Sequence, residues 1–61
     1  MARTHNDHVQ AVDSTGRIEV RTSDGRTFRL IRVSDGMELQ TLGNLAAATA
    51  RANQMTSTGE A

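Results

Sequence analysis

The sequence predicts an α+β domain, with an antiparallel β-meander of three or four strands followed by one C-terminal helix that packs on one sheet face. Three observations predict this fold. A Ser-Asp-Gly turn signal occurs at residues 23–25 and again at 34–36, and short segments of alternating apolar and polar residues flank both turns. After residue 41 the apolar residues change to helical spacing. The strands are expected at about 8–12, 17–22, 26–33 and 37–41, and the helix at about 45–55.

The length of the chain predicts a single domain. A chain of 61 residues buries only about 60% of the surface that its unfolded form exposes, so its stability is marginal. We assign the domain to residues 8–55, with a flexible N-terminal segment over 1–7 and a disordered tail over 56–61. Because the sequence contains no Cys, disulfides cannot compensate, and oligomerisation becomes the natural source of further stability.

The first hairpin is predicted from the register that aligns apolar residues. A four-residue loop over 13–16 sets Ala11 opposite Ile18 and Val9 opposite Val20, so that all four side chains share one sheet face.

The second hairpin is predicted by the same test. A two-residue loop would place apolar residues opposite charged ones, whereas a three-residue loop over 23–25 sets Val20 opposite Phe28. This register also sets Glu19 opposite Arg29 on the other face, as a cross-strand ion pair.

The third hairpin leaves two alternatives. Its Ser-Asp-Gly loop sets Arg32 opposite Glu38, but strict alternation puts Leu30 on one face and both Ile31 and Val33 on the other. Either a β-bulge near Leu30 and Ile31 restores a single core face, or both faces are buried and a partner chain covers the back of the sheet. We favour the bulge, which would gather a core of Ile18, Val20, Phe28, Leu30, Val33, Met37 and Leu39.

The helix is predicted from a seam of Leu45, Ala48, Ala52 and Met55, with Asn44 as its N-cap. Further alanines cannot all lie on the buried side, so some apolar helix surface should remain exposed and favour self-association or a partner.

The composition argues against several classes of protein. No apolar run approaches the roughly 18–20 residues that span a bilayer, so we expect no membrane contact and a cytoplasmic protein. Cys and Lys are absent and every Ser before residue 40 lies in an expected turn, so we predict no enzyme and no cofactor. The segment His5-Asn6-Asp7-His8 is the one cluster of metal-ligand residue types, but it offers too few rigid ligands, and we predict no metal site.

The charge distribution gives the main indication of function. The whole chain has a net charge of zero, yet residues 17–33 carry five arginines against Glu19 and Asp24, a net charge of +3. The candidate binding residues are Arg17, Arg21, Arg26, Arg29 and Arg32. The Glu19–Arg29 and Arg32–Glu38 ion pairs would make this only a solvated face, which is the commoner role of charged sheet surfaces.

We therefore expect a small non-enzymatic binding module whose Arg-rich sheet face contacts a macromolecular partner. Duplex nucleic acid is favoured, because guanidinium groups on a sheet can contact phosphates and guanine edges in a major groove. The layout resembles that of several DNA-binding sheet domains, although no residue motif assigns the chain to a family. The alternative is a protein–protein interaction module, an adaptor or inhibitor, that forms a homodimer through the helix and the back of the sheet. The position of Ile31 and Val33 discriminates between the two, because apolar residues on the back would make the back an interface.

Overall fold

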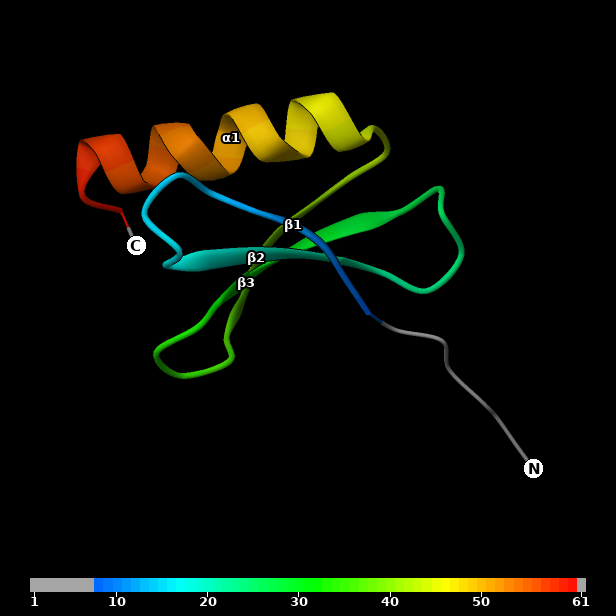
Figure 1. Cartoon of the computed structure of the whole chain (residues 1–61), viewed down its shortest axis with the longest axis horizontal. Helices are drawn as coiled ribbons and strands as arrows, with labels where there is room; N and C mark the ends of the chain where they lie inside the picture. Colours follow the sequence, from blue (N-terminus) through cyan, green and yellow to red (C-terminus); the bar gives the residue numbers. More distant parts are fainter. Residues whose placement is uncertain (1–7, 61) are drawn as a thin grey trace.

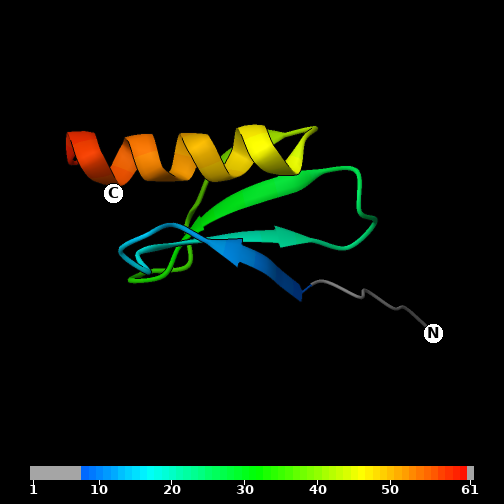
Figure 2. The same cartoon turned by 45° about the horizontal axis from the view of Figure 1, so that its top comes forward.

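The computed structural model describes residues 8–60 and forms two layers, a four-stranded antiparallel sheet and one helix (Figures 1 and 2). The strands follow one another in the order β1-β2-β3-β4, and the helix lies across one face of the sheet. The elements are β1 (His8–Val12), β2 (Ile18–Thr22), β3 (Phe28–Arg32), β4 (Glu38–Leu42) and α1 (Leu45–Thr58). The predicted α+β meander with a C-terminal helix is confirmed, with all four strands. The segment 1–7, which we expected to be flexible, and its His5-to-Asp7 portion lie outside the described residues.

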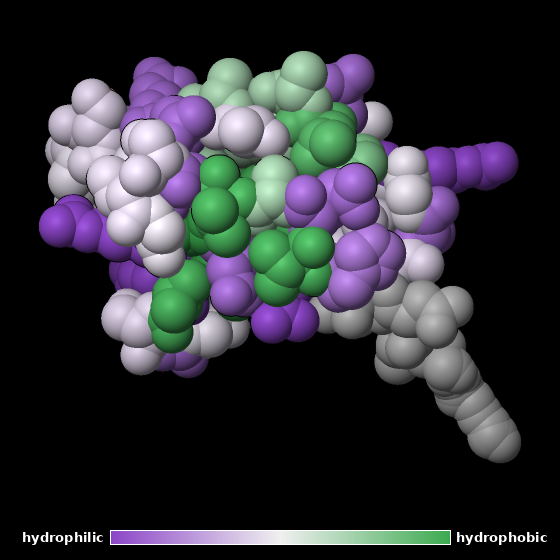
Figure 3. All heavy atoms as spheres, in the orientation of Figure 1, coloured by the Kyte–Doolittle hydropathy of each residue, from purple (hydrophilic) through white to green (hydrophobic). Residues whose placement is uncertain are grey.

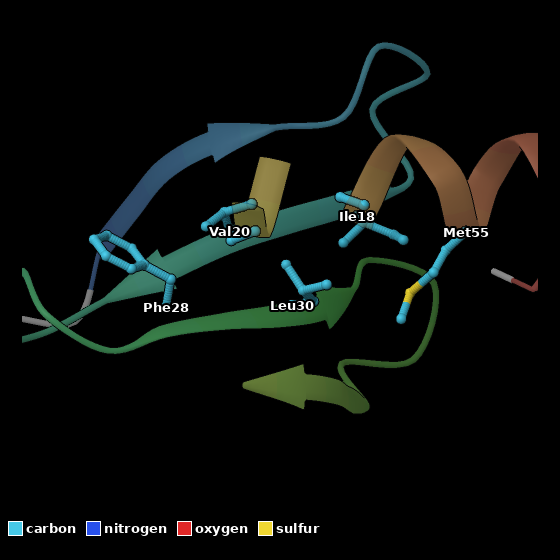
Figure 4. Close-up of a cluster of buried hydrophobic side chains, with 7 residues drawn as sticks. Ile18, Val20, Phe28, Leu30 and Met55 are labelled. Carbon is cyan, nitrogen blue, oxygen red and sulfur yellow. The ribbon is translucent and has the colours of Figure 1, made fainter. Parts of the chain in front are cut away.

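The core lies between the two central strands and the helix. Alternate residues of β2 and β3 point toward α1, and Met55 reaches down to them from the helix (Figure 4). The helix contributes small residues, which bring its backbone close to the sheet. The buried apolar residues are Ile18, Val20, Phe28, Leu30, Ala48, Ala52 and Met55.

The register of the β2–β3 hairpin differs from the prediction. Val20 lies opposite Leu30 instead of Phe28, so the loop covers the five residues 23–27. The Asp24 carboxylate accepts hydrogen bonds from the backbone N–H groups of Arg26 and Thr27, at 2.8 and 2.9 Å, and thereby keeps two more residues in the loop. A shift of two residues preserves the inward face, because side chains alternate with a period of two.

The β1–β2 hairpin is also shifted. Ala11 pairs with Val20, not with Ile18 as predicted, and a β-bulge separates this pair from the pairing of Val9 with Arg21. The bulge changes the phase of β1, so Ala11 packs against the core while Val9 lies on the opposite face.

The β3–β4 pairing contains the bulge that the sequence predicts near Leu30 and Ile31, but its effect differs from the prediction. Leu39, on β4, is partly buried against the core, as expected. Val33 and Met37 are not part of the core, because the ladder beyond the bulge keeps Ile31 opposite Glu38 on the face away from the helix. The predicted inclusion of Val33 and Met37 in the core is wrong.

The helix begins at its predicted cap and ends later than predicted. The Asn44 side chain accepts a hydrogen bond from the Ala47 N–H at 3.0 Å. Helical structure continues through Thr58, beyond the expected end near residue 55, and ends at Gly59 with φ +81°. Glycine suits this left-handed position, which lets the Glu60 N–H donate to the Met55 carbonyl at 2.8 Å. Within residues 8–60, no helix has the length and apolarity to cross a membrane.

Candidate binding face of the sheet

The sheet has one face turned away from α1, here called the outer face, and its side chains form two adjacent rows across the strands. The basic row contains Val9, Arg21, Arg29 and Thr41, which are register neighbours from β1 to β4. The acidic row contains Val12, Glu19, Ile31 and Glu38 in the same strand order. Each row therefore mixes two like charges with apolar or neutral side chains.

Apolar side chains are exposed on and beside these rows. Val9 is 41% exposed and Val12 49%, while Val33 and Met37 of the β3–β4 hairpin reach 50% and 54%. Figure 3 shows green apolar side chains along β1 and below it, separated by purple polar ones. Ile31, at the centre of the acidic row, is half-buried. The outer face is thus neither wholly polar nor a continuous apolar patch.

Two shallow hollows, of about 400 and 500 Å³, adjoin on either side of Val33. The first lies between the β1–β2 and β3–β4 turns and is lined by Gly16, Arg17, Arg32, Val33 and Ser34. The second extends over the acidic row and is lined by Glu19, Arg21, Ile31, Arg32, Val33 and Gly36. Each hollow is therefore bordered by two arginines, and the two hollows share Arg32 and Val33.

No protein-family model matches the chain, and neither the curated proteins nor the solved structures include a match. The residues of the outer face are therefore the only indication of function that the described part of the chain provides.

The structure brings together four of the five predicted arginines. Arg21 and Arg29 lie directly opposite each other in the basic row. Arg17 lies at the end of β2, where its carbonyl accepts a hydrogen bond from the Val33 N–H at 2.9 Å, and Arg32 borders both hollows. Arg26 belongs to the β2–β3 loop and lies at the other end of the sheet.

The ion pairs differ from the predicted ones. Glu19 lies opposite Ile31, and its carboxylate accepts a hydrogen bond from Arg21 on the same strand, with Nε–Oε1 at 3.0 Å. The predicted Glu19–Arg29 pairing is wrong because the longer loop shifts the register. Like charges directly opposite in a sheet are destabilising, and Glu19 reduces this cost for the two arginines of the basic row.

The predicted Arg32–Glu38 pairing is also wrong, because the bulge sets Glu38 opposite Ile31. Arg32 instead binds Asp35 through two hydrogen bonds, Nε–Oδ1 at 3.0 Å and Nη2–Oδ2 at 2.7 Å. The hydrogen bonds from Arg32 and from the Met37 N–H lower the pKa of Asp35 to about 2. Asp35 therefore shapes the turn, as its Ser-Asp-Gly context predicts, and partly neutralises the arginine that borders both hollows.

Asp13 is a buried carboxylate that stabilises the β1–β2 turn, a role that the sequence analysis did not predict. Its side chain is 2% exposed, and it accepts hydrogen bonds from the Ile18 N–H and from the N–H and hydroxyl of Thr15. Burial opposes ionisation, but these hydrogen bonds and one with the Thr56 side chain outweigh it and hold the pKa of Asp13 well below its usual value. The turn is further tied to α1, because the Ser14 N–H donates to Asn53 Oδ1 at 2.8 Å.

The sequence offers one signal for this role of Asp13. A Thr two residues after an Asp, within a turn that ends in Gly, is typical of a carboxylate that accepts hydrogen bonds from its own turn. That the carboxylate is also buried beneath the end of the helix depends on tertiary packing, which this signal does not contain.

The lowered pKa values predict acid-sensitive stability. Asp13, Asp24 and Asp35 all have a lower pKa in the folded chain than the usual 3.8, mainly because of the hydrogen bonds that each carboxylate accepts. The unfolded chain therefore binds more protons as the pH falls through about 4, and the stability that these groups contribute above that pH is lost as the pH falls toward about 2. Urea denaturation should give a constant unfolding free energy from neutral pH to about pH 5 and a steep decrease below about pH 4. An unchanged unfolding free energy down to about pH 2 would contradict this account.

Within residues 8–60, no three His, Cys, Asp or Glu side chains lie close enough to hold a metal ion. The described residues instead form a surface for non-covalent binding, with charged rows, exposed apolar side chains and two hollows.

Proposed function

We propose that the chain is a protein-interaction module and that the outer face of the sheet is its binding surface. The observation that carries this proposal is the placement of Ile31 and Val33 on the outer face, beside the exposed Val9 and Val12. Arginine and aliphatic side chains that alternate on an uncovered sheet suit a partner surface with carboxylates and apolar groups. Helix α1 supports this surface from behind but does not cover it.

The pairing of charges within the chain also favours a protein partner. Two arginines near the hollows have carboxylate partners, Arg21 with Glu19 and Arg32 with Asp35. A phosphate that approaches either guanidinium also meets that carboxylate, so less counterion release accompanies binding than five arginines alone would give. A protein surface can satisfy both signs of charge at once.

Duplex nucleic acid is the second candidate, and a different observation supports it. Arg21 and Arg29 lie opposite each other, with Arg17 toward one end of the face, and guanidinium groups on a sheet can contact phosphates and guanine edges. Binding of this kind would weaken steeply as salt is added.

A site-specific photo-crosslinker in place of Val33 tests both candidates, with the same crosslinker in place of Gln54 as the matched control. Val33 is half exposed on the outer face, whereas Gln54 is exposed on α1, on the opposite side of the sheet. In a lysate of cells that express the protein, we expect a protease-sensitive adduct from position 33 and none from position 54. A nuclease-sensitive adduct at position 33 would establish the second candidate instead. No adduct, or the same adduct from both positions, would overturn the proposal.

A further inference from the structure

We infer that the partner of the outer face is a second copy of this chain, packed face to face about a two-fold axis. This inference rests on the proposed function and names the partner of the same surface. It follows from the order of charges along the strands, because a basic row and an acidic row lie next to each other on one face.

In one orientation of the two-fold axis, the basic row of each copy faces the acidic row of the other copy. Consider a two-fold axis that lies between the two sheets, perpendicular to the strands, and passes between the rows. It sets the basic row of one copy against the acidic row of the other. Arg21 then lies opposite Glu19 of the second copy, and Arg29 lies opposite the second copy's Ile31, between its two glutamates. An axis parallel to the strands would instead set each row against itself, with like charges opposed.

The apolar side chains fit the same arrangement. Val9 of the basic row lies opposite Val12 of the second copy, and both valines are more than 40% exposed in the single chain, at 41% and 49%. Ile31 packs under the aliphatic part of the Arg29 side chain of the second copy, as long cationic side chains commonly cover apolar surface. The interface thus covers apolar groups that the helix leaves exposed.

The size of the face sets the expected strength of association. Four strands about 4.8 Å apart, each with five residues that rise about 3.4 Å, give a footprint on the order of 300 Å² per copy. The two copies together bury about 600 Å², less than the roughly 1,200 Å² of stable interfaces, so we expect a weak, reversible dimer with a dissociation constant on the order of 100 μM. Such an interface also supplies stability that a chain of this length lacks by itself.

Sedimentation equilibrium between about 5 μM and about 1 mM, a range that brackets the expected dissociation constant, tests the inference. The wild-type chain should pass from monomer to dimer. R29E should weaken the dimer at least about tenfold, because the new carboxylate faces Glu19 and Glu38 of the second copy. R51E is the control with the same change in charge, on α1 at the opposite side of the sheet, and it should dimerise like the wild type. Circular dichroism establishes that each variant is folded.

The decisive experiment reverses the charge on the opposing residue as well. E38R should also weaken the dimer, and an equimolar mixture of R29E with E38R should recover association, because the exchanged charges then face each other. A wild-type chain that stays monomeric throughout, an equal effect of R51E, or a mixture that does not associate would overturn the inference. A monomeric chain that still crosslinks another protein from position 33 would leave the proposed function standing, so the two failures can be told apart.

Discussion

Replacement of Asp13 by alanine is expected to remove about 3 kcal/mol of stability, because it deprives buried donors of a charged acceptor. The carboxylate is 2% exposed and accepts hydrogen bonds from Ile18 and Thr15, so the buried Ile18 N–H would remain without a partner. A domain of 61 residues has a total unfolding free energy of roughly 3–9 kcal/mol. Urea denaturation followed by circular dichroism measures the loss, since the chain has no Trp or Tyr for fluorescence.

Asp24→Ala is the matched control for this prediction. Asp24 also lies in a turn and accepts two backbone hydrogen bonds, from Arg26 and Thr27, but its surroundings are exposed. Water can replace the lost acceptor there, so the denaturation midpoint should change much less than for Asp13→Ala. Equal losses from both substitutions would mean that burial of Asp13 beneath the helix contributes nothing.

The sequence predicted the order of elements and most of the core because both depend on local periodicity. Ile18, Val20 and Leu30 alternate with polar residues, and any even shift of register leaves them on the same face. The turn residues marked the hairpins correctly. The exact pairings were missed, because Asp24 holds a five-residue loop through backbone hydrogen bonds that a count of apolar matches does not include.

The candidate binding face was predicted in part. Alternation placed Arg21 and Arg29 on the outer face, but their direct opposition follows from the loop length and was not foreseen. The exposure of Val33 was an open alternative in the sequence, since a bulge can rotate a strand either way. The structure resolves it because the extra residue lies on β4, where it turns Leu39 toward the core and leaves the phase of β3 unchanged.

Leu30→Ala is expected to destabilise the chain by about 3 kcal/mol, because Leu30 is fully buried between the sheet and the helix and its removal leaves a cavity. Val33→Ala is the control on the opposite face. Val33 is 50% exposed, so its truncation should change the unfolding free energy of the monomer by no more than about 0.5 kcal/mol. Urea denaturation at low protein concentration, where the chain is monomeric, measures both.

The same pair of variants distinguishes a core residue from an interface residue when the loss of stability is measured at increasing protein concentration. The loss caused by Leu30→Ala should not depend on concentration, since its contacts are within one chain. Residues that bind a partner stabilise the folded state only when the partner is present, so any stability that the outer face gains from a second copy must grow with concentration. If Val33→Ala were as damaging as Leu30→Ala in dilute solution, Val33 would belong to the core of the single chain, and the outer face would lose the observation on which its proposed role depends.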